Sequence, residues 1–285
     1  MAPTLVLSSD CTAPRLEAMT TTASRPRVVR RGAAGWVPNQ HGAWAMLVVP
    51  WLLGAAHMVR HDGDVVSALL LLVFWMAGYF AFFATSQWLR SRCKPRYRGA
   101  VFTYAAVTGA LGVGLLVLRP EWWSWALVFS PLVGLSLWLS WRRRDRGLLS
   151  GATTVAAACL LPLVMGSQGV WPWTVPVELV GVALVCFGYF FGTVLYVKTL
   201  IRERGSRGWV AASVAWHVAW LVAALALPDA LPRVAVGVFF ALMASRALVV
   251  PWLGPLRGRT VKAKDAGLGE FVSTAVLLVI LLPAW

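Results

Sequence analysis

The chain has 285 residues, of which 59% are hydrophobic and 13% are charged, with a mean hydropathy of +0.70. A soluble domain carries about 25% charged and 45–50% apolar residues, so this composition excludes an ordinary soluble protein and predicts an all-α, polytopic membrane protein. The formal net charge of +15 then reflects topology and contact with the acidic lipid of the inner leaflet, and we expect no nucleic-acid partner.

Residues 1–37 are polar, rich in Ala, Pro, Ser and Thr, and basic towards their end, where they read "SRPRVVRRG". The apolar piece "LVL" is too short for a signal-peptide core, which needs about 7–15 apolar residues. We therefore predict a disordered, basic cytosolic tail, followed by a transmembrane helical domain over residues 38–285.

Nine segments are long and apolar enough to cross a bilayer, which requires about 20 residues of helix. They cover residues 42–59, 65–89, 99–118, 122–141, 147–168, 175–197, 209–227, 231–253 and 268–285. The short connections between them leave no room for an inserted soluble domain.

Lysine and arginine collect in the tail and in alternate loops, which hold 22 of the 26 basic residues. Because basic loops stay on the cytosolic side, we predict a cytosolic N-terminus and an external C-terminus in the inner (plasma) membrane of a bacterium.

Two pairs of matching motifs suggest an internal repeat of four helices. "LVVPWLLG" in span one matches "CLLPLVMG" in span five, and the Arg90 and Arg202 motifs at the ends of spans two and six have the same offset of 112 residues. We predict a 4+4+1 parallel repeat, with the ninth span added at the end.

Two basic stretches, "RSRCKPRYRG" after span two and "YVKTLIRERG" at the end of span six, are the main candidates for a site. Arginine forks match phosphate or carboxylate, so together they predict a cytosolic pocket for an acidic headgroup. The predicted anion-binding residues are Arg90, Arg92, Lys94, Arg96, Arg98, Lys198, Arg202 and Arg204. Topology and snorkelling of long side chains explain the same cations without a site.

Four further polar residues lie near the predicted cytosolic ends of spans one and six. Tyr196 and Glu203 share a face of span six with Thr199, and Gln40 with His41 precedes span one. If chemistry occurs, the residues that orient or deprotonate an acceptor are Gln40, His41, Tyr196 and Glu203.

A secondary group surrounds the start of span nine. Its members are Arg246, Lys262, Lys264, Asp265 and Glu270. Arg246 lies inside span eight and must find an acid or a carbonyl, and Glu270 lies at a suitable depth.

The sequence predicts no metal and no cofactor. His41, His57 and His217 fall at three different depths, which disfavours haem ligation by two histidines. The four cysteines have no metal-ligand or paired spacing, which argues against a thiolate site or a disulfide framework.

The stretches "QHGAWAML", "KPRYRG", "YVKTLIRERG" and "KAKDAGLGE" resemble the signature segments of the YwiC-like family of bacterial membrane proteins. The span count and repeat are also distantly similar to UbiA-type prenyltransferases, which have nine helices and substrate motifs at the cytosolic ends of helices two and six. That family holds magnesium diphosphate with Asp-rich motifs, whereas "ATSQWLRSRCK" has no acid and the end of span six offers only Glu203. Magnesium needs carboxylate ligands, so the resemblance does not bring metal-assisted prenyl transfer with it.

Three functions fit these features. The favoured one is a UbiA-like fold whose basic cytosolic pocket holds a lipid or isoprenoid phosphate, with catalysis left open. The alternatives are a small-anion transporter, or a structural or assembly protein without a ligand; protein partners are unspecified.

Overall fold

Each apolar segment forms an α-helix, because in hydrocarbon only a helix or a closed barrel satisfies the backbone hydrogen bonds. The computed structural model describes residues 35–38, 43–256 and 263–283. The α-helices are α1 Ala43–His61, α2 Val65–Arg90, α3 Arg98–Leu118, α4 Ala126–Trp141, α5 Leu148–Cys159, α6 Leu161–Gly166, α7 Val177–Ile201, α8 Arg207–Ala223, α9 Arg233–Leu256 and α10 Ala263–Leu281. Short 3₁₀ helices η1 Pro95–Tyr97, η2 Pro120–Trp125 and η3 Ala224–Ala226 adjoin them, so the fold is all-α.

Eight of the nine predicted spans are confirmed as helices long and apolar enough to cross a membrane, with α5 and α6 together making one span. The ninth forms as α10, but it begins at Ala263 rather than at residue 268. With Lys264, Asp265 and Glu270, this helix carries more charged residues than the other spans. Hydropathy therefore placed its predicted start too late, after Lys264 and Asp265. The protein is a multi-pass membrane protein.

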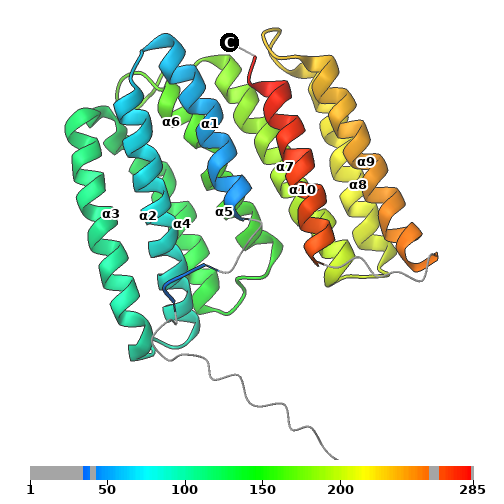
Figure 1. Cartoon of the computed structure of the whole chain (residues 1–285), viewed down its shortest axis with the longest axis horizontal. Helices are drawn as coiled ribbons and strands as arrows, with labels where there is room; N and C mark the ends of the chain where they lie inside the picture. Colours follow the sequence, from blue (N-terminus) through cyan, green and yellow to red (C-terminus); the bar gives the residue numbers. More distant parts are fainter. Residues whose placement is uncertain (1–34, 39–42, 257–262, 284–285) are drawn as a thin grey trace, which may run out of the picture. The chain divides into compact units, whose positions relative to one another are not determined.

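Helix α7 contacts α1, α5, α6, α8, α9 and α10. Adjacent antiparallel pairs include α2 with α3, α4 with α5, α7 with α8 and α8 with α9, while α1 contacts α2, α5, α6, α7 and α10 (Figure 1). In α7, 67% of the most apolar stretch is buried within the protein, against 11% for the span that contains α3. Exposed apolar side chains such as Phe102 and Val113 on α3 are what a lipid-facing helix presents.

The fifth span is broken between α5 and α6, near Leu160. Pro162 lies at the start of α6, and a proline inside a continuous helix would lack an N–H and clash with the preceding turn. The matching Pro50 lies inside the unbroken α1. A methyl group on Gly54 would lie 2.8 Å from the Pro162 Cα, so the two similar motifs contact each other. The repeat itself stays a prediction.

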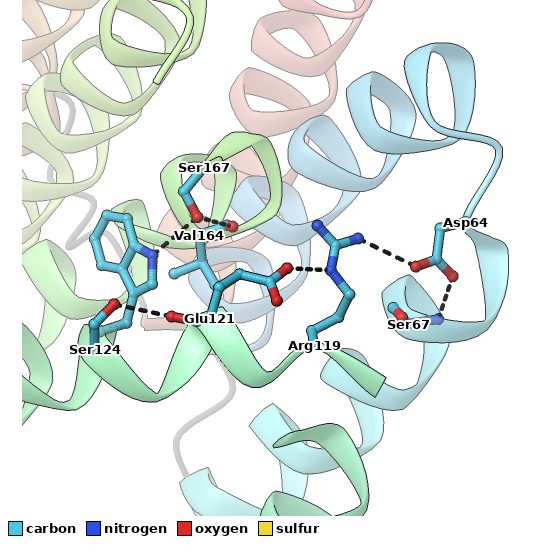
Figure 2. A network of polar contacts seen from close by, with 8 residues as sticks. Asp64, Ser67, Arg119, Glu121, Ser124, Val164 and Ser167 are labelled. Atoms are coloured by element: carbon cyan, nitrogen blue, oxygen red, sulfur yellow. Dashed lines mark hydrogen bonds and ion pairs between the residues drawn. The ribbon is translucent and has the colours of Figure 1, made fainter. Parts of the chain in front are cut away.

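At the end opposite the basic loops, Arg119 ties α2 to η2 (Figure 2). Its Nη1 lies 3.2 Å from Asp64 Oδ2, and its Nε donates to Glu121 Oε1 at 2.6 Å. Asp64 is also the N-cap of α2 and accepts from the Ser67 backbone N–H at 2.9 Å. Desolvation of the carboxyl opposes its ionisation, but the hydrogen bonds from Ser67 and Arg119 outweigh this and lower the Asp64 pKa.

A second contact at this end joins η2 to the end of α6. Trp125 Nε1 donates to Ser167 Oγ at 3.0 Å, and the Ser167 hydroxyl donates to the Val164 carbonyl at 2.7 Å (Figure 2). Trp125 also stacks on Trp173 with 3.9 Å between ring centroids. These contacts fix the connections at this end.

Asp64→Asn should lower the melting temperature in detergent at neutral pH, because it keeps an N-cap but loses the charge paired with Arg119. We expect an effect of about 1 kcal/mol or less, since the pair is partly exposed. A lowered carboxyl pKa stabilises the fold above the unfolded value, 3.8, and this contribution disappears as the pH falls through the folded value. The difference between wild type and variant should therefore vanish in acid.

The control for this measurement is Asp62→Asn, which removes the same charge from an exposed position of the same loop. Equal melting temperatures for the two variants at neutral pH would contradict a stabilising role for Asp64.

Candidate functional site

Three loops rich in arginine lie at one end of the helices, at the bottom of Figure 1, because α2, α4 and α7 end there. We call this the basic end. Its described cations outside α9 and α10 are Arg90, Arg92, Lys94, Arg96, Arg98, Arg142, Arg143, Arg144, Arg146, Lys198, Arg202, Arg204 and Arg207. The fold thus brings the two predicted basic stretches to the same end.

The loop between α4 and α5 connects these two stretches. On one side Arg90 Nη1 lies 3.1 Å from Asp145 Oδ2. On the other side Lys198 Nζ donates to the Arg146 carbonyl at 3.1 Å, with Arg202 Nη1 3.5 Å from the same oxygen. Sequence reasoning missed Asp145, although a lone acid within "RRRDRG" was the available signal.

A cavity of about 140 Å³ lies at the basic end between α2, α4 and α5. We call it the basic-end pocket. From α2 it is lined by Tyr79, Phe82, Phe83, Ser86, Gln87 and Arg90. The other helices and their loop contribute Ser140, Asp145, Ser150, Gly151 and Thr154.

Two hydroxyl groups in the pocket lining have no hydrogen-bond partner among the described residues. They are Tyr79 Oη and Ser86 Oγ, and both atoms are buried. A buried polar group without a partner costs about 1–3 kcal/mol, so these two atoms mark a place where the described residues do not satisfy their own polar groups. The pocket is therefore suited to a ligand with hydrogen-bonding oxygens.

Arginines occupy backbone positions that favour glycine at the ends of two pocket helices. Arg92 and Arg143 have φ of 62° and 57°. After α2, the Cys93 N–H bonds the Trp88 carbonyl and the Arg92 N–H bonds the Leu89 carbonyl, which is a Schellman motif. The same pattern follows α4 at Arg143 and Arg144. Arg92 and Arg143 thus occupy the ends of two helices that line the pocket, although a positive φ is sterically unfavourable for arginine.

The other predicted site residues lie apart from the pocket lining. Lys94, Arg96 and Arg98 are exposed, as are Arg202 and Arg204. Tyr196 is buried on α7, and its ring faces the Arg246 guanidinium at 4.3 Å. Glu203 is half-buried just beyond α7. Gln40, His41, Lys262 and the side chain of Lys264 lie outside the described residues.

A buried polar network joins α7, α9 and α10. Arg246 Nη1 lies 2.8 Å from Glu270 Oε1, so the acid partner predicted for Arg246 is observed. Glu270 Oε2 also accepts from Thr193 at 2.7 Å and from Tyr189 at 3.2 Å. Sequence reasoning missed Tyr189 and Thr193, whose spacing of four residues on α7 was the available signal. Asp265 is exposed.

Comparison with known proteins places these features in a family. A family model described as YwiC-like protein matches residues 37–166. "Uncharacterized protein YwiC" of Bacillus subtilis is 30% identical over 189 residues, which cover 64% of this chain and 73% of that protein. The chain belongs to the YwiC-like family. An uncharacterized protein of Haemophilus influenzae is 24% identical over 248 residues, 87% of this chain and 98% of that protein.

No solved structure matches the chain. The segment matched by the YwiC-like model contains every residue that lines the basic-end pocket, whereas the Arg246–Glu270 network lies beyond it. The similarity to UbiA-type prenyltransferases stays a prediction.

Arg143→Gly should raise the free energy of unfolding by about 1 kcal/mol, because glycine adopts a positive φ without the steric cost of a side chain. The matched control is Arg142→Gly, since Arg142 has an ordinary φ of −75° and loses the same charge. Denaturant or thermal unfolding in detergent measures both. Equal stabilisation by the two variants would assign the effect to charge and contradict the backbone explanation.

Proposed function

We propose that this YwiC-like protein binds the phosphorylated headgroup of a membrane lipid or isoprenoid in its basic-end pocket. The observation that carries the proposal is one cavity lined both by Arg90 and by two unpartnered hydroxyls, Tyr79 Oη and Ser86 Oγ. Phosphate oxygens accept hydrogen bonds from both kinds of group.

Arg90 is poised to exchange partners. Its contact with Asp145 joins one guanidinium nitrogen to one carboxylate oxygen, and the two side chains are 39% and 24% exposed. A bidentate arginine–phosphate pair is stronger than such a single contact. An arriving phosphate can therefore replace Asp145, and the charge of Arg90 stays paired throughout.

The pocket has the polarity of an amphiphile. Arg90 and Ser86 lie one turn apart near the end of α2, where one phosphate can contact both side chains, and Tyr79 lies two turns deeper, where its hydroxyl is left for a further oxygen of the ligand. The side chains of Phe82 and Phe83 line the cavity between them. A headgroup at Arg90 would place the first part of an apolar chain against these rings.

The remaining cations act at longer range. The exposed arginines and Lys94 around the pocket raise the local concentration of anionic lipid, and Lys198 and Arg202 hold the α4–α5 loop through the Arg146 carbonyl. The same excess of basic residues supports a cytosolic basic end, with the N-terminus inside and the C-terminus outside the inner membrane. A UbiA-like 4+4+1 arrangement belongs to this proposal and awaits a test.

Native mass spectrometry of gently purified protein tests the pocket. Wild type should retain a phosphorylated lipid or isoprenoid, and Arg90→Ala should lose most of it, because charge-assisted hydrogen bonds contribute about 1.5–3 kcal/mol. The control, Arg207→Ala, removes an exposed cation of the basic end that does not line the pocket. Equal retention by all three proteins, or retention by none of them, would contradict a ligand site at Arg90. The basic residues would then be explained by membrane topology alone. The retained mass distinguishes a lipid from an isoprenoid.

Tyr79→Phe gives an independent test, because it removes a hydroxyl without changing charge. In protein stripped of ligand it should raise the melting temperature, since a buried unpartnered group disappears; in native mass spectrometry it should lower ligand retention. In the control Tyr104→Phe, the hydroxyl lost donates to the Trp36 carbonyl at 2.8 Å, so stability should fall by about 1 kcal/mol with retention unchanged. A loss of stability in Tyr79→Phe without change in retention would count against the pocket.

A further inference from the structure

A second site lies away from the basic-end pocket, where α7, α8, α9 and α10 meet. Arg246 is near the middle of α9, and its side chain is 18% exposed, with 14% for its partner Glu270. An arginine at such a depth costs about 2.5–3.5 kcal/mol on insertion scales. Ionisable residues kept inside a membrane domain mark ligand or ion sites more often than structural ones.

The contacts of Arg246 use only one of its three nitrogens. Nη1 donates to Ser273 Oγ at 3.1 Å and forms the 2.8 Å ion pair with Glu270 Oε1. Nε and Nη2 are buried and have no hydrogen-bond partner among the described residues. These two nitrogens form one edge of the guanidinium and present two parallel N–H groups. That edge is the fork that binds two oxygens of one carboxylate or phosphate.

Glu270 does not supply those oxygens. Its Oε2 is taken by Thr193 and Tyr189, and the Tyr189 hydroxyl in turn lies 2.9 Å from Thr274 Oγ1. The flat face of the guanidinium is covered by the Tyr196 ring at 4.3 Å. The orientation of Arg246 is thus fixed from two sides, while its Nε–Nη2 edge has no hydrogen-bond partner among the described residues.

A buried proton acceptor lies one helical turn away. His217 on α8 is 0% exposed, and its Nδ1 is 2.7 Å from the Ser213 carbonyl. A carbonyl only accepts, so Nδ1 carries the hydrogen and Nε2 has a free lone pair in the neutral ring. Nε2 has no partner among the described residues. It abuts α7 at Gly192, where a methyl group would lie 2.7 Å away.

Gly192 and Tyr196 are four residues apart on one face of α7, about 6 Å along its axis. His217, which abuts Gly192, and Arg246, which covers Tyr196, therefore flank one short stretch of the same helix. The other ionisable groups that interact with Arg246 are Tyr189 and Tyr196 on α7 and Glu270 on α10.

We propose that the Nε–Nη2 edge of Arg246 binds the carboxylate of a small monoanion within the membrane domain, with uptake of one proton. Arg246 and Glu270 already neutralise each other, so a bound monoanion alone would leave an uncompensated buried charge, which is costly. A proton from solvent that adds to the His217 Nε2 lone pair restores neutrality, and no bond other than this N–H forms. Carboxylates fit better than dianionic phosphate, which would require two protons.

Isothermal titration of purified protein with acetate, propionate and benzoate tests this site. Wild type should bind at least one of these probes saturably, and more tightly in mildly acidic than in neutral buffer, with uptake of up to one proton per anion, obtained from buffers of different ionisation enthalpy. Arg246→Lys keeps the charge but removes the fork, and should weaken binding about tenfold or more, because a charge-assisted hydrogen bond exceeds 1.4 kcal/mol. The control Arg233→Lys changes the first residue of the same helix, where Arg233 pairs with Asp229, and should bind as wild type.

A second variant keeps the test valid if Arg246→Lys fails to fold. His217→Gln retains the fork but cannot take up the proton, so it should bind the anion more weakly than wild type and without the proton uptake of wild type. Absence of saturable binding to wild type, or equal affinity in a folded Arg246→Lys, overturns the site; unchanged proton uptake in His217→Gln overturns the assignment to His217. None of these variants changes a residue of the basic-end pocket. The proposal for the pocket and the proposal for this site can therefore be contradicted independently of each other.

Discussion

Hydrocarbon offers no hydrogen-bond partner, and this constraint decides where each polar group of the membrane domain lies. Several hydroxyl groups within the helices donate to carbonyls of the preceding turn, as Thr154 does to Ser150, Ser245 to Ala241 and Ser273 to Gly269. Most described charges lie at helix ends, where water and headgroups solvate them. The Arg246–Glu270 pair is the described exception in the interior, where the two charges balance each other, two hydroxyls from α7 donate to Glu270 and Arg246 donates to Ser273 on α10.

Against this background, the unsatisfied groups carry the functional information. The Tyr79 and Ser86 hydroxyls border a cavity at the rim, next to exposed cations and solvent. The free edge of Arg246 lies deeper, where its charge is already balanced by Glu270. A site at the rim can neutralise a phosphate with several mobile cations, whereas a buried neutral pair admits a new charge only together with a counter-charge. The two places therefore select ligands of different size and charge.

Hydropathy predicted the spans well, because a membrane helix satisfies its backbone within one continuous segment. It placed the start of α10 too late, since the charges of Lys264 and Asp265 obscure the helix. The partner of Arg246 was predictable because so few charges lie at its depth. The basic-end pocket was not predictable from the sequence, because it forms only where α4 and α5 pack beside α2. A stretch such as "ATSQWLR" does not show which helices will lie next to it. Asp145 likewise gained meaning only once the fold brought it to Arg90.

The stretch "GYFFGTV" in α7 shows how much an apolar run can conceal. Gly188 and Gly192 lie on the face towards α8, where added methyl groups would lie 2.4 Å from the Trp220 ring and 2.7 Å from His217. Because no side chain covers this face, Trp216 Nε1 reaches the Gly188 carbonyl at 2.8 Å. Tyr189 and Thr193, each one residue on, lie about 100° around the helix and bind Glu270 on α10. Small residues that permit close packing and polar residues that hold a charge thus alternate within two turns, and a hydropathy average hides both.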